Sequence, residues 1–139
     1  MVKIICKEDC GNAPKKLLLK ELTSAFATGS AQRVLLPRLA DDVTWEIVGA
    51  EPIQGKDAVA RMLAEAAKSG YQATQLEIEN IITHGNAGSV NGYITMADGK
   101  QYAFCDVYRW SGTSEKSAIR KITSFSIEVH GHSIDQVIE

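Results

Sequence analysis

The sequence predicts an α+β domain in which helices cover one face of a curved, mainly antiparallel sheet. Up to residue 70 the apolar residues mostly recur at helical spacing, whereas from residue 71 they alternate with polar residues as strands do. Asp98-Gly99 lies between two alternating segments and is a strong signal for a β-hairpin. Helices followed by a run of antiparallel strands are typical of the α+β class. A curved sheet capped by helices encloses a cavity, a common place for a ligand.

Length, charge and hydropathy limit the classes of protein to which the chain can belong. Its 139 residues suffice for one domain with a sizeable core, so we expect a single domain over residues 1–139. The net charge is −2 and no run of Lys and Arg exceeds two residues, so the electrostatic signature of nucleic-acid binding is missing. No segment approaches the ~20 apolar residues of a membrane span, and the N-terminus lacks a convincing signal peptide. We therefore expect a cytoplasmic protein that binds neither nucleic acid nor a membrane.

The first forty residues predict two helices. Asn12 is a candidate N-cap and Pro14 suits a first helical turn, while Gly29 is a suitable stop for the helix that follows them. A second, shorter helix is expected over residues 32–39, where Pro37 disturbs it.

A strand and a third helix are expected next. Asp41-Asp42 predicts a turn, residues 43–47 alternate as a strand, and the segment 49–52 breaks that strand. The third helix follows Gly55, ends at Gly70 and carries its apolar residues at Val59, Met62, Leu63 and Ala66.

The second half of the chain predicts four strands. They are expected over residues 71–83, 89–96, 102–110 and 118–129. A turn over residues 85–88 joins the first two of these strands, and the Asp98-Gly99 hairpin precedes the third.

One face of the strand over residues 102–110 carries four aromatic rings and one carboxylic acid. Because side chains alternate between the faces of a strand, this face holds Tyr102, Phe104, Asp106, Tyr108 and Trp110. Such a face is typical of a pocket wall, and desolvation among rings raises the pKa of a carboxylic acid and makes it a candidate proton donor or acceptor. The alternative is an Asp that caps a turn or pairs with Arg109 or Arg120 at a sheet edge. Because Asp is uncommon at strand centres, we favour the pocket.

Two motifs make the chain similar to a known superfamily. The segment LADDVTWEIVGAEPIQGKDA, residues 39–58, and the segment CDVYRW, residues 105–110, followed by the strand 119–122, resemble motifs of the nuclear transport factor 2-like superfamily. That superfamily includes ketosteroid isomerase, the SnoaL-like polyketide cyclases and limonene-epoxide hydrolase. The resemblance covers roughly residues 13–129 and implies a cone-shaped sheet around helices. It specifies the fold better than the activity, because this fold hosts enzymes, transport factors and assembly modules.

The isomerase's functional residues carry over only in part. Asp106 matches the acid that, in the isomerase, stays protonated and donates a hydrogen bond to the developing oxyanion. The isomerase's tyrosine matches Leu22, and its general base matches either Ile47 or Glu46, depending on how the strand is counted. We prefer Ile47, because Val43, Trp45 and Ile47 then form one apolar face and Glu46 points outward. On that count the base is missing, and the other acids of the epoxide hydrolase find no clear match.

We therefore predict a pocket for a small apolar or aromatic molecule, without a metal or other cofactor. Asp106 is the expected acid or hydrogen-bond donor, with Tyr108 as a second donor. The expected walls are Trp45, Ile47, Leu63, Tyr102, Phe104, Trp110, Thr123, Phe125 and Ile127. Core packing is the alternative role for each aromatic ring. Three classes of function stay open at this point: an isomerase-, cyclase- or hydrolase-like enzyme, a non-catalytic binder, and a dimeric assembly module.

The opposite face of the sheet predicts a homodimer. Ala103, Cys105 and Val107 on one strand, with Ile122, Ser124 and Ser126 on the next, are expected to form a flat and weakly polar surface. Members of the resembling superfamily often pair through this face. The alternative is that residues 130–139 partly cover it.

The cysteines predict neither a disulfide framework nor a metal site. An odd count of three at irregular spacing fits a reducing compartment. Cys6 and Cys10 could join His130 and His132 as metal ligands, but the spacing matches no familiar zinc pattern.

Overall fold

A computed structural model describes residues 2–6, 13–69, 72–114 and 116–131 of the chain. The described strands form one seven-stranded sheet in the order β1-β4-β5-β6-β7-β2-β3. They are β1 (Lys3–Cys6), β2 (Leu39–Ile47), β3 (Ile53–Gln54), β4 (Ala73–His84), β5 (Ala87–Met96), β6 (Gln101–Trp110) and β7 (Ile119–Val129). The helices are α1 (Pro14–Thr28), α2 (Ala31–Leu35) and α3 (Lys56–Lys68), with a 3₁₀ turn over Leu36–Arg38.

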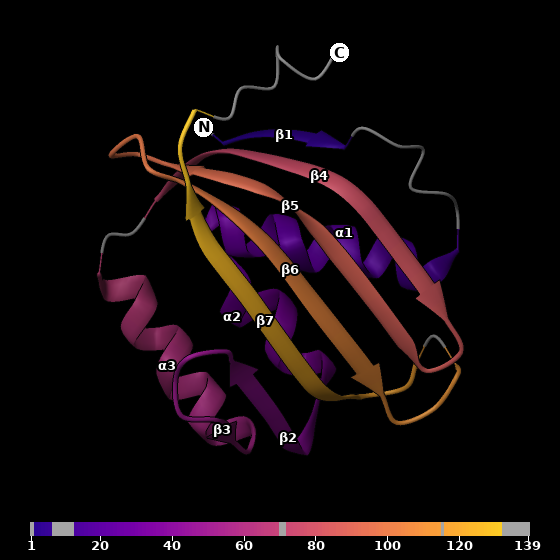
Figure 1. The fold of residues 1–139 in the computed structure, drawn as a ribbon. Coiled ribbons are helices and arrows are strands. Elements are labelled where there is room, and N and C mark those ends of the chain that lie inside the picture. The colour runs from indigo at the N-terminus through magenta and orange to yellow at the C-terminus, as the bar shows by residue number, and fades with distance from the viewer. Residues whose placement is uncertain (1, 7–12, 70–71, 115, 132–139) are drawn as a thin grey trace.

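The sheet curves around the helices, as the sequence predicts. Helices α1 and α2 lie against one face of the strands β4 to β7, and α3 lies beside β2 and β3 at the end of the sheet (Figure 1). Strands β4 to β7 pair antiparallel in sequence order, while β1 joins β4 and β2 joins β7 in parallel. The predicted α+β class with a curved, mainly antiparallel sheet is therefore confirmed.

Helix α1 has a weak beginning and a well-defined end. Its N-cap is Ala13, which offers no side-chain hydrogen bond, and Pro14 occupies the first turn, where a missing N–H costs nothing. Gly29 ends the helix in the left-handed region, at φ 83°, as the sequence predicts. The candidate cap Asn12 lies outside the described residues, as does Gly70, the predicted end of the third helix.

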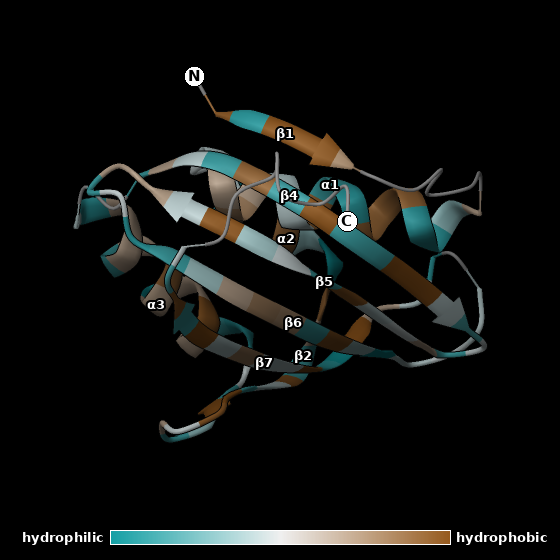
Figure 2. Ribbon diagram, turned by 45° about the horizontal axis from the view of Figure 1, so that its top comes forward, coloured by the Kyte–Doolittle hydropathy of each residue, from teal (hydrophilic) through white to brown (hydrophobic). Residues whose placement is uncertain are grey.

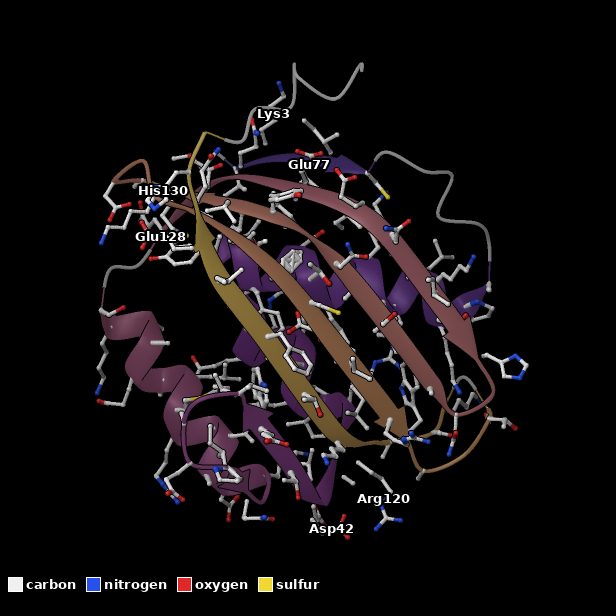
Figure 3. All side chains as sticks on the ribbon, viewed as in Figure 1. Lys3, Asp42, Glu77, Arg120, Glu128 and His130 are labelled. Atoms are coloured by element: carbon white, nitrogen blue, oxygen red, sulfur yellow. The ribbon has the colours of Figure 1, made fainter. Side chains whose placement is uncertain are left out.

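One prediction about β2 needs correction. Asp41-Asp42 is not a turn but lies within β2, where the strand bulges away from its neighbour. Between Leu39 and Thr44, β2 advances by five residues while β7 advances by two, from Ile119 to Lys121. The bulge leaves Asp42 exposed, and Arg120 pairs with it across the strands at 3.3 Å (Figure 3). Polar residues at a bulge resemble those of a turn in sequence, since both expose the backbone.

The strand β1 is a second difference from the prediction. Its four residues carry an apolar run too short to identify by periodicity, and it pairs with β4 along one edge of the sheet. Hydrophobic and hydrophilic residues alternate more clearly along the longer strand β4 (Figure 2). Length therefore explains why one strand is predictable and the other is not.

The register of the sheet decides which side chains face the helices. Asp106 on β6 lies directly opposite Val90 on β5 and Ser124 on β7, and directly opposite residues share a face. Tyr108 lies opposite Ile122, which is 1% exposed and belongs to the core. The helix-facing residues of β7 are therefore Ile122, Ser124 and Ser126.

The state of Cys6 differs from what a reducing compartment without a disulfide framework would give. Cys6 is disulfide-bonded, whereas Cys105 on β6 is a free thiol. Burial raises the pKa of the Cys105 thiol, and the nearby charge of Asp106 raises it further.

None of the helices in the described part of the chain is long and apolar enough to span a membrane.

Candidate functional site

A cavity of about 180 Å³ lies between α1 and the helix-facing side of the sheet. Side chains from five elements line it: Thr23 and Phe26 of α1, Trp45 of β2, Leu76 of β4, Ile94 of β5, and Phe104 and Asp106 of β6. Phe26 and Trp45 meet edge to face, with ring centroids 5.6 Å apart at 61°. The Thr23 hydroxyl donates to the Leu19 carbonyl at 2.7 Å, inside its own helix. The lining is therefore apolar apart from Asp106 and one hydroxyl that already has an acceptor.

Asp106 is the ionisable group of this cavity. The strand alternation of β6 turns it toward α1, opposite Val90 and in a lining that also holds Phe104 and Trp45. Burial raises the pKa of its carboxyl group to about 6, although a hydrogen bond from Ser124 favours the charged form. The effect of desolvation on the pKa therefore outweighs that of the hydrogen bond, and the carboxyl group titrates close to neutral pH.

Ser124 connects Asp106 to the indole of Trp45. The Trp45 N–H donates to the Ser124 hydroxyl at 2.9 Å, and Ser124 lies directly opposite Asp106 across the β6–β7 pair. The three residues come from three adjacent strands, β2, β7 and β6. The arrangement gives a part-buried serine two neighbours that lie 61 residues apart in the sequence.

Tyr108 and Trp110 continue the same face of β6 but do not line the cavity. Tyr108 is fully buried and Trp110 is 1% exposed, and their rings stack with centroids 6.1 Å apart. Among the described residues, neither the Tyr108 hydroxyl nor the Trp110 N–H has a hydrogen-bond partner. The Lys15 ammonium lies 4.6 Å from the centre of the Trp110 ring and donates to the carbonyls of Gly85 and Gly112. This end of the face is consequently a packed layer rather than a wall.

The structure brings together some of the predicted site residues. Trp45, Phe104 and Asp106 line the cavity, whereas Leu63 is a core residue and Ile47 and Tyr102 pack against the core. The lining residues that sequence reasoning missed are Thr23, Phe26, Leu76 and Ile94. They lie on helix and strand faces whose sequence pattern is that of an ordinary core, and no sequence signal distinguishes a cavity wall from a packed interior.

The predicted orientation of β7 was wrong. Thr123, Phe125 and Ile127 point away from the cavity, because the register places Ser124 and not Thr123 opposite Asp106. Phe125 is 46% exposed and Ile127 is 68% exposed, on the outer face of the sheet. The larger apolar residues of this strand were assigned to the interior, but its cavity-facing positions hold small serines.

The structure answers the question of how to count β2. Ile47 pairs with Ser124 on the helix-facing side, whereas Glu46 pairs with Thr123 on the outer side. Ile47 packs against the core, so no second carboxylate from this strand enters the cavity. Of the two positions considered from the sequence, the inward-facing one is therefore the apolar Ile47, as the preferred count predicts.

A family comparison decides what kind of domain holds this cavity. A model of the SnoaL-like domain matches residues 19–114, more than half of the chain. The chain belongs to the SnoaL-like family. No curated protein matches it.

Solved structures with similar folds agree with this assignment to the nuclear transport factor 2-like superfamily. The SnoaL-like chain is similar to an NTF2-like protein of unknown function from Cytophaga hutchinsonii, at 23% identity and a TM-score of 0.60, over 80% of this chain and 97% of that one. A second NTF2-like protein of unknown function, from Mesorhizobium loti, matches at 13% identity and a TM-score of 0.64, over 88% and 98% of the two chains. An LEH-like epoxide hydrolase of M. tuberculosis matches at 17% identity and a TM-score of 0.62, over 80% of each chain. At these identities the likeness shows the fold alone.

The outer face of the SnoaL-like sheet carries a second, larger depression. It measures about 490 Å³ and includes Val48, Tyr93, Ala103, Cys105, Phe125 and Ile127. Phe104 borders both this groove and the inner cavity, so at this ring the wall between them is one residue thick. Ile122, which was expected on this outer face, is instead buried in the core.

The described part of this SnoaL-like chain contains no group of three or more His, Cys, Asp or Glu side chains that could hold a metal ion. Of the four residues considered as ligands from the sequence, Cys10 and His132 lie outside the described residues.

Proposed function

We propose that this SnoaL-like protein binds a small, largely apolar molecule in the inner cavity, with Asp106 as its principal polar contact. The observation that carries the proposal is a carboxylic acid set in an otherwise apolar cavity wall, with its proton exchanging near neutral pH. A desolvated acid lowers the stability of a fold, so its presence in a cavity is a reason to look for a ligand there.

The volume of the cavity limits the size of the ligand. Pockets for drug-sized molecules usually measure ~300–1,000 Å³, and this cavity measures about 180 Å³. An engineered apolar cavity of ~150 Å³ in another protein admits benzene. We therefore infer a ligand built around one ring or a short branched chain, with one oxygen atom placed to meet Asp106.

Binding has more support than a complete catalytic site. Among the described residues of the lining, the Trp45 N–H already donates to Ser124, and Thr23 already donates its hydrogen within α1, so Thr23 offers only an acceptor toward the cavity. The Tyr108 hydroxyl, proposed as a second donor, belongs to a fully buried residue outside the lining.

Acid–base catalysis is the second candidate function. A pKa of about 6 leaves both forms of Asp106 populated near neutral pH, which is where general acid–base assistance is most effective. Such assistance contributes roughly 10²–10⁴-fold to a rate. On this reading the protein promotes proton transfer on a small apolar substrate, in the manner of an isomerase, cyclase or hydrolase.

Three ring-sized probes test the binding proposal. Cyclohexanone accepts a hydrogen bond, phenol donates one to a carboxylate, and toluene does neither. We expect cyclohexanone to bind more tightly below pH 6 and phenol above it, with no pH dependence for toluene, because Asp106 changes from donor to acceptor as it ionises. Two-dimensional NMR shifts of the Trp45 indole and the Phe104 amide report occupancy. If none of the probes shifts these signals at millimolar concentration, the cavity is not a binding site.

Two variants assign the pH dependence to one residue. Asp106→Asn removes the titrating group, so cyclohexanone affinity should become independent of pH. Asp41→Asn, at an exposed position of β2, is the matched control and should keep the wild-type profile. A pH dependence that survives in Asp106→Asn would assign the effect to another group.

We further propose that the protein pairs with a second copy of itself through the outer face of the sheet. The groove of about 490 Å³ and the exposed Phe125 and Ile127 support this proposal, since apolar patches of this kind often mark interfaces.

A further inference from the structure

We propose that the end of the molecule at which α1 begins is a second binding site, which takes a phosphate group, either as the free ion or as part of a small molecule. Among the described residues, this site and the inner cavity share no lining residue. The inference therefore goes beyond the proposed function and stands or fails independently of it.

Lys15 is a buried cation without a counter-ion. The residue is 7% exposed, and its ammonium group donates to the carbonyl oxygens of Gly85 and Gly112 at 3.0 and 3.1 Å. The centre of the Trp110 ring lies 4.6 Å from the ammonium nitrogen. All three partners are neutral, and in the described part of the chain no carboxylate pairs with Lys15. Because a buried charge is costly unless an opposite charge balances it, the ammonium group indicates that an anion binds here.

A hollow of about 530 Å³ lies beside this ammonium group. Its lining comes from the start of α1, the end of β4 and the loops after β4 and β6: Ala13, Pro14, Lys15, Thr83, His84, Gly85 and Thr113. The two threonine hydroxyls and the histidine ring can each donate a hydrogen bond to an oxyanion. Hydrogen-bond donors from separate segments of the chain therefore surround one space.

A second basic hollow adjoins the first. It measures about 330 Å³, shares Pro14 with the first hollow, and is lined also by Leu18, Arg38 and Lys116. Among the described residues that line the two hollows, four are basic and none is acidic, although the whole chain has 17 Asp and Glu against 15 Lys and Arg. The positive end of the α1 dipole adds to the same field, since α1 begins at Pro14. This end of an acidic chain is therefore a site of positive potential.

The distribution of the donors favours phosphate over a carboxylate. A carboxylate presents two oxygen atoms in one plane, whereas a phosphate group on an organic molecule presents three strong acceptor oxygens and up to two negative charges. The first hollow has donors on α1, on β4 and on the loop after β6, which a tetrahedral anion can meet at the same time. The second hollow, with the guanidinium group of Arg38, is suited to the remainder of the ligand or to a second anionic group.

The test uses inorganic phosphate, phenyl phosphate and acetate as probes, with sodium chloride at matched ionic strength. In two-dimensional NMR spectra, both phosphates should shift the amides of Gly85 and Thr113 saturably at millimolar concentration, and acetate should bind more weakly. Tighter binding of phenyl phosphate, with an added shift at Lys116, indicates an organic phosphate, and tighter binding of the inorganic ion indicates free phosphate. Equal shifts with chloride, or acetate binding as tight as that of both phosphates, overturn the proposal.

Three variants assign the binding to this end of the molecule. Lys15→Met removes the buried charge and should weaken phosphate binding by about tenfold or more, since hydrogen bonds to charged groups are the strong ones. Lys116→Gln removes an exposed charge and should weaken it only about two- to fivefold. Lys100→Gln makes the same change in the hairpin after β5, at the opposite end of the sheet (Figure 1), and should leave the affinity unchanged.

A fourth variant keeps the test valid if Lys15→Met fails to fold, since Lys15 also joins α1 to two loops. Thr83→Val keeps the shape of the side chain, removes one donor of the first hollow, and should weaken phosphate binding several-fold while cyclohexanone binding in the inner cavity stays the same. Wild-type phosphate affinity in both Thr83→Val and Lys116→Gln overturns the site. So does an equal loss in Lys100→Gln and Lys116→Gln, because the attraction would then come from the charge of the whole molecule.

Discussion

At the scale of single residues, the cost of placing a carboxylic acid in an apolar wall should appear in the stability of the protein. The folded pKa of Asp106 is about 6, above its ordinary value of 3.8, so the folded state holds the proton over a pH range in which the unfolded state has lost it. Asp106 therefore contributes nothing unfavourable below pH 4, and its cost grows as the pH rises to 6 and is constant above. The full shift corresponds to about 3 kcal/mol as an upper bound.

Asp106→Asn should consequently be at least as stable as the wild type at pH 7. The amide keeps the shape of the acid and removes the charge that must otherwise be desolvated. Its advantage should shrink between pH 6 and pH 4, measured by urea unfolding at each pH, with Asp41→Asn as the control. A variant that is markedly less stable at pH 7 would indicate that the carboxylate is well compensated in the fold.

A second prediction at this scale compares the stability effects of removing an unpaired and a paired polar group from two aromatic residues. Tyr108→Phe removes a buried hydroxyl that has no partner among the described residues, so stability should be unchanged or higher by up to about 1 kcal/mol. Trp45→Phe removes an N–H that donates to Ser124 and also reduces the ring, so it should cost about 2 kcal/mol or more. Thermal and urea unfolding of both variants check this contrast. Equal losses would mean that the Tyr108 hydroxyl has a partner, such as a buried water molecule.

Much of the site could be predicted at the residue scale, and the failures have physical causes. The alternation of β6 correctly placed Phe104 and Asp106 on one inward face, because strand geometry leaves only two choices. Ser124 was assigned to the wrong face, because hydrophobicity was used to orient a strand whose outer face is the more apolar one. A strand with apolar residues on both faces has no single orientation in its sequence.

At the scale of elements, Gly92 holds β5 close to β4. A Cβ atom built at this position would lie 1.9 Å from the Glu77 carbonyl oxygen, which is backbone and cannot turn aside. Gly92→Ala should therefore force the two strands apart near the bulge between Ile78 and Asn80, and we expect a loss of several kcal/mol. The matched control is Gly85→Asn in the adjoining turn, where φ is 60° and nothing lies within 4 Å of an added Cβ. Urea unfolding of the two variants should differ strongly, and similar losses would contradict the close approach.

Element boundaries were predictable where a long segment kept one period. The strands β5, β6 and β7 and the helix α3 appear close to their predicted positions, since each spans several periods. The four residues of β1 and the bulged start of β2 could not be predicted, because pairing with strands distant in the sequence determines them. Such pairing is invisible in a local pattern.

At the scale of the whole molecule, the outer face of the sheet should mediate self-association. Ile127→Glu places a charge on the most exposed large apolar residue of the groove, so it should weaken the expected homodimer. Leu17→Glu, at a 50% exposed position of α1, makes the same change away from the sheet and should leave association unaltered. Light scattering across a range of micromolar concentrations measures both. A wild-type protein that stays monomeric throughout would remove the basis for this interface.

The parallel pairing of β2 with β7 determines when, during folding, the cavity is completed. The first residues of the pair, Leu39 and Ile119, are separated by 80 positions, and among the described strands β2 has only β7 and the two-residue β3 beside it in the sheet. During synthesis, β2 and its Trp45 can therefore join the sheet only after β7 has been made. Ser124, which lies between Trp45 and Asp106, is itself part of β7. Contacts of this sequence separation slow folding, because a long loop must close before they form. The site should accordingly be the last part of the molecule to be completed, and a ribosome-bound chain that ends before residue 119 should fold its hairpins without it.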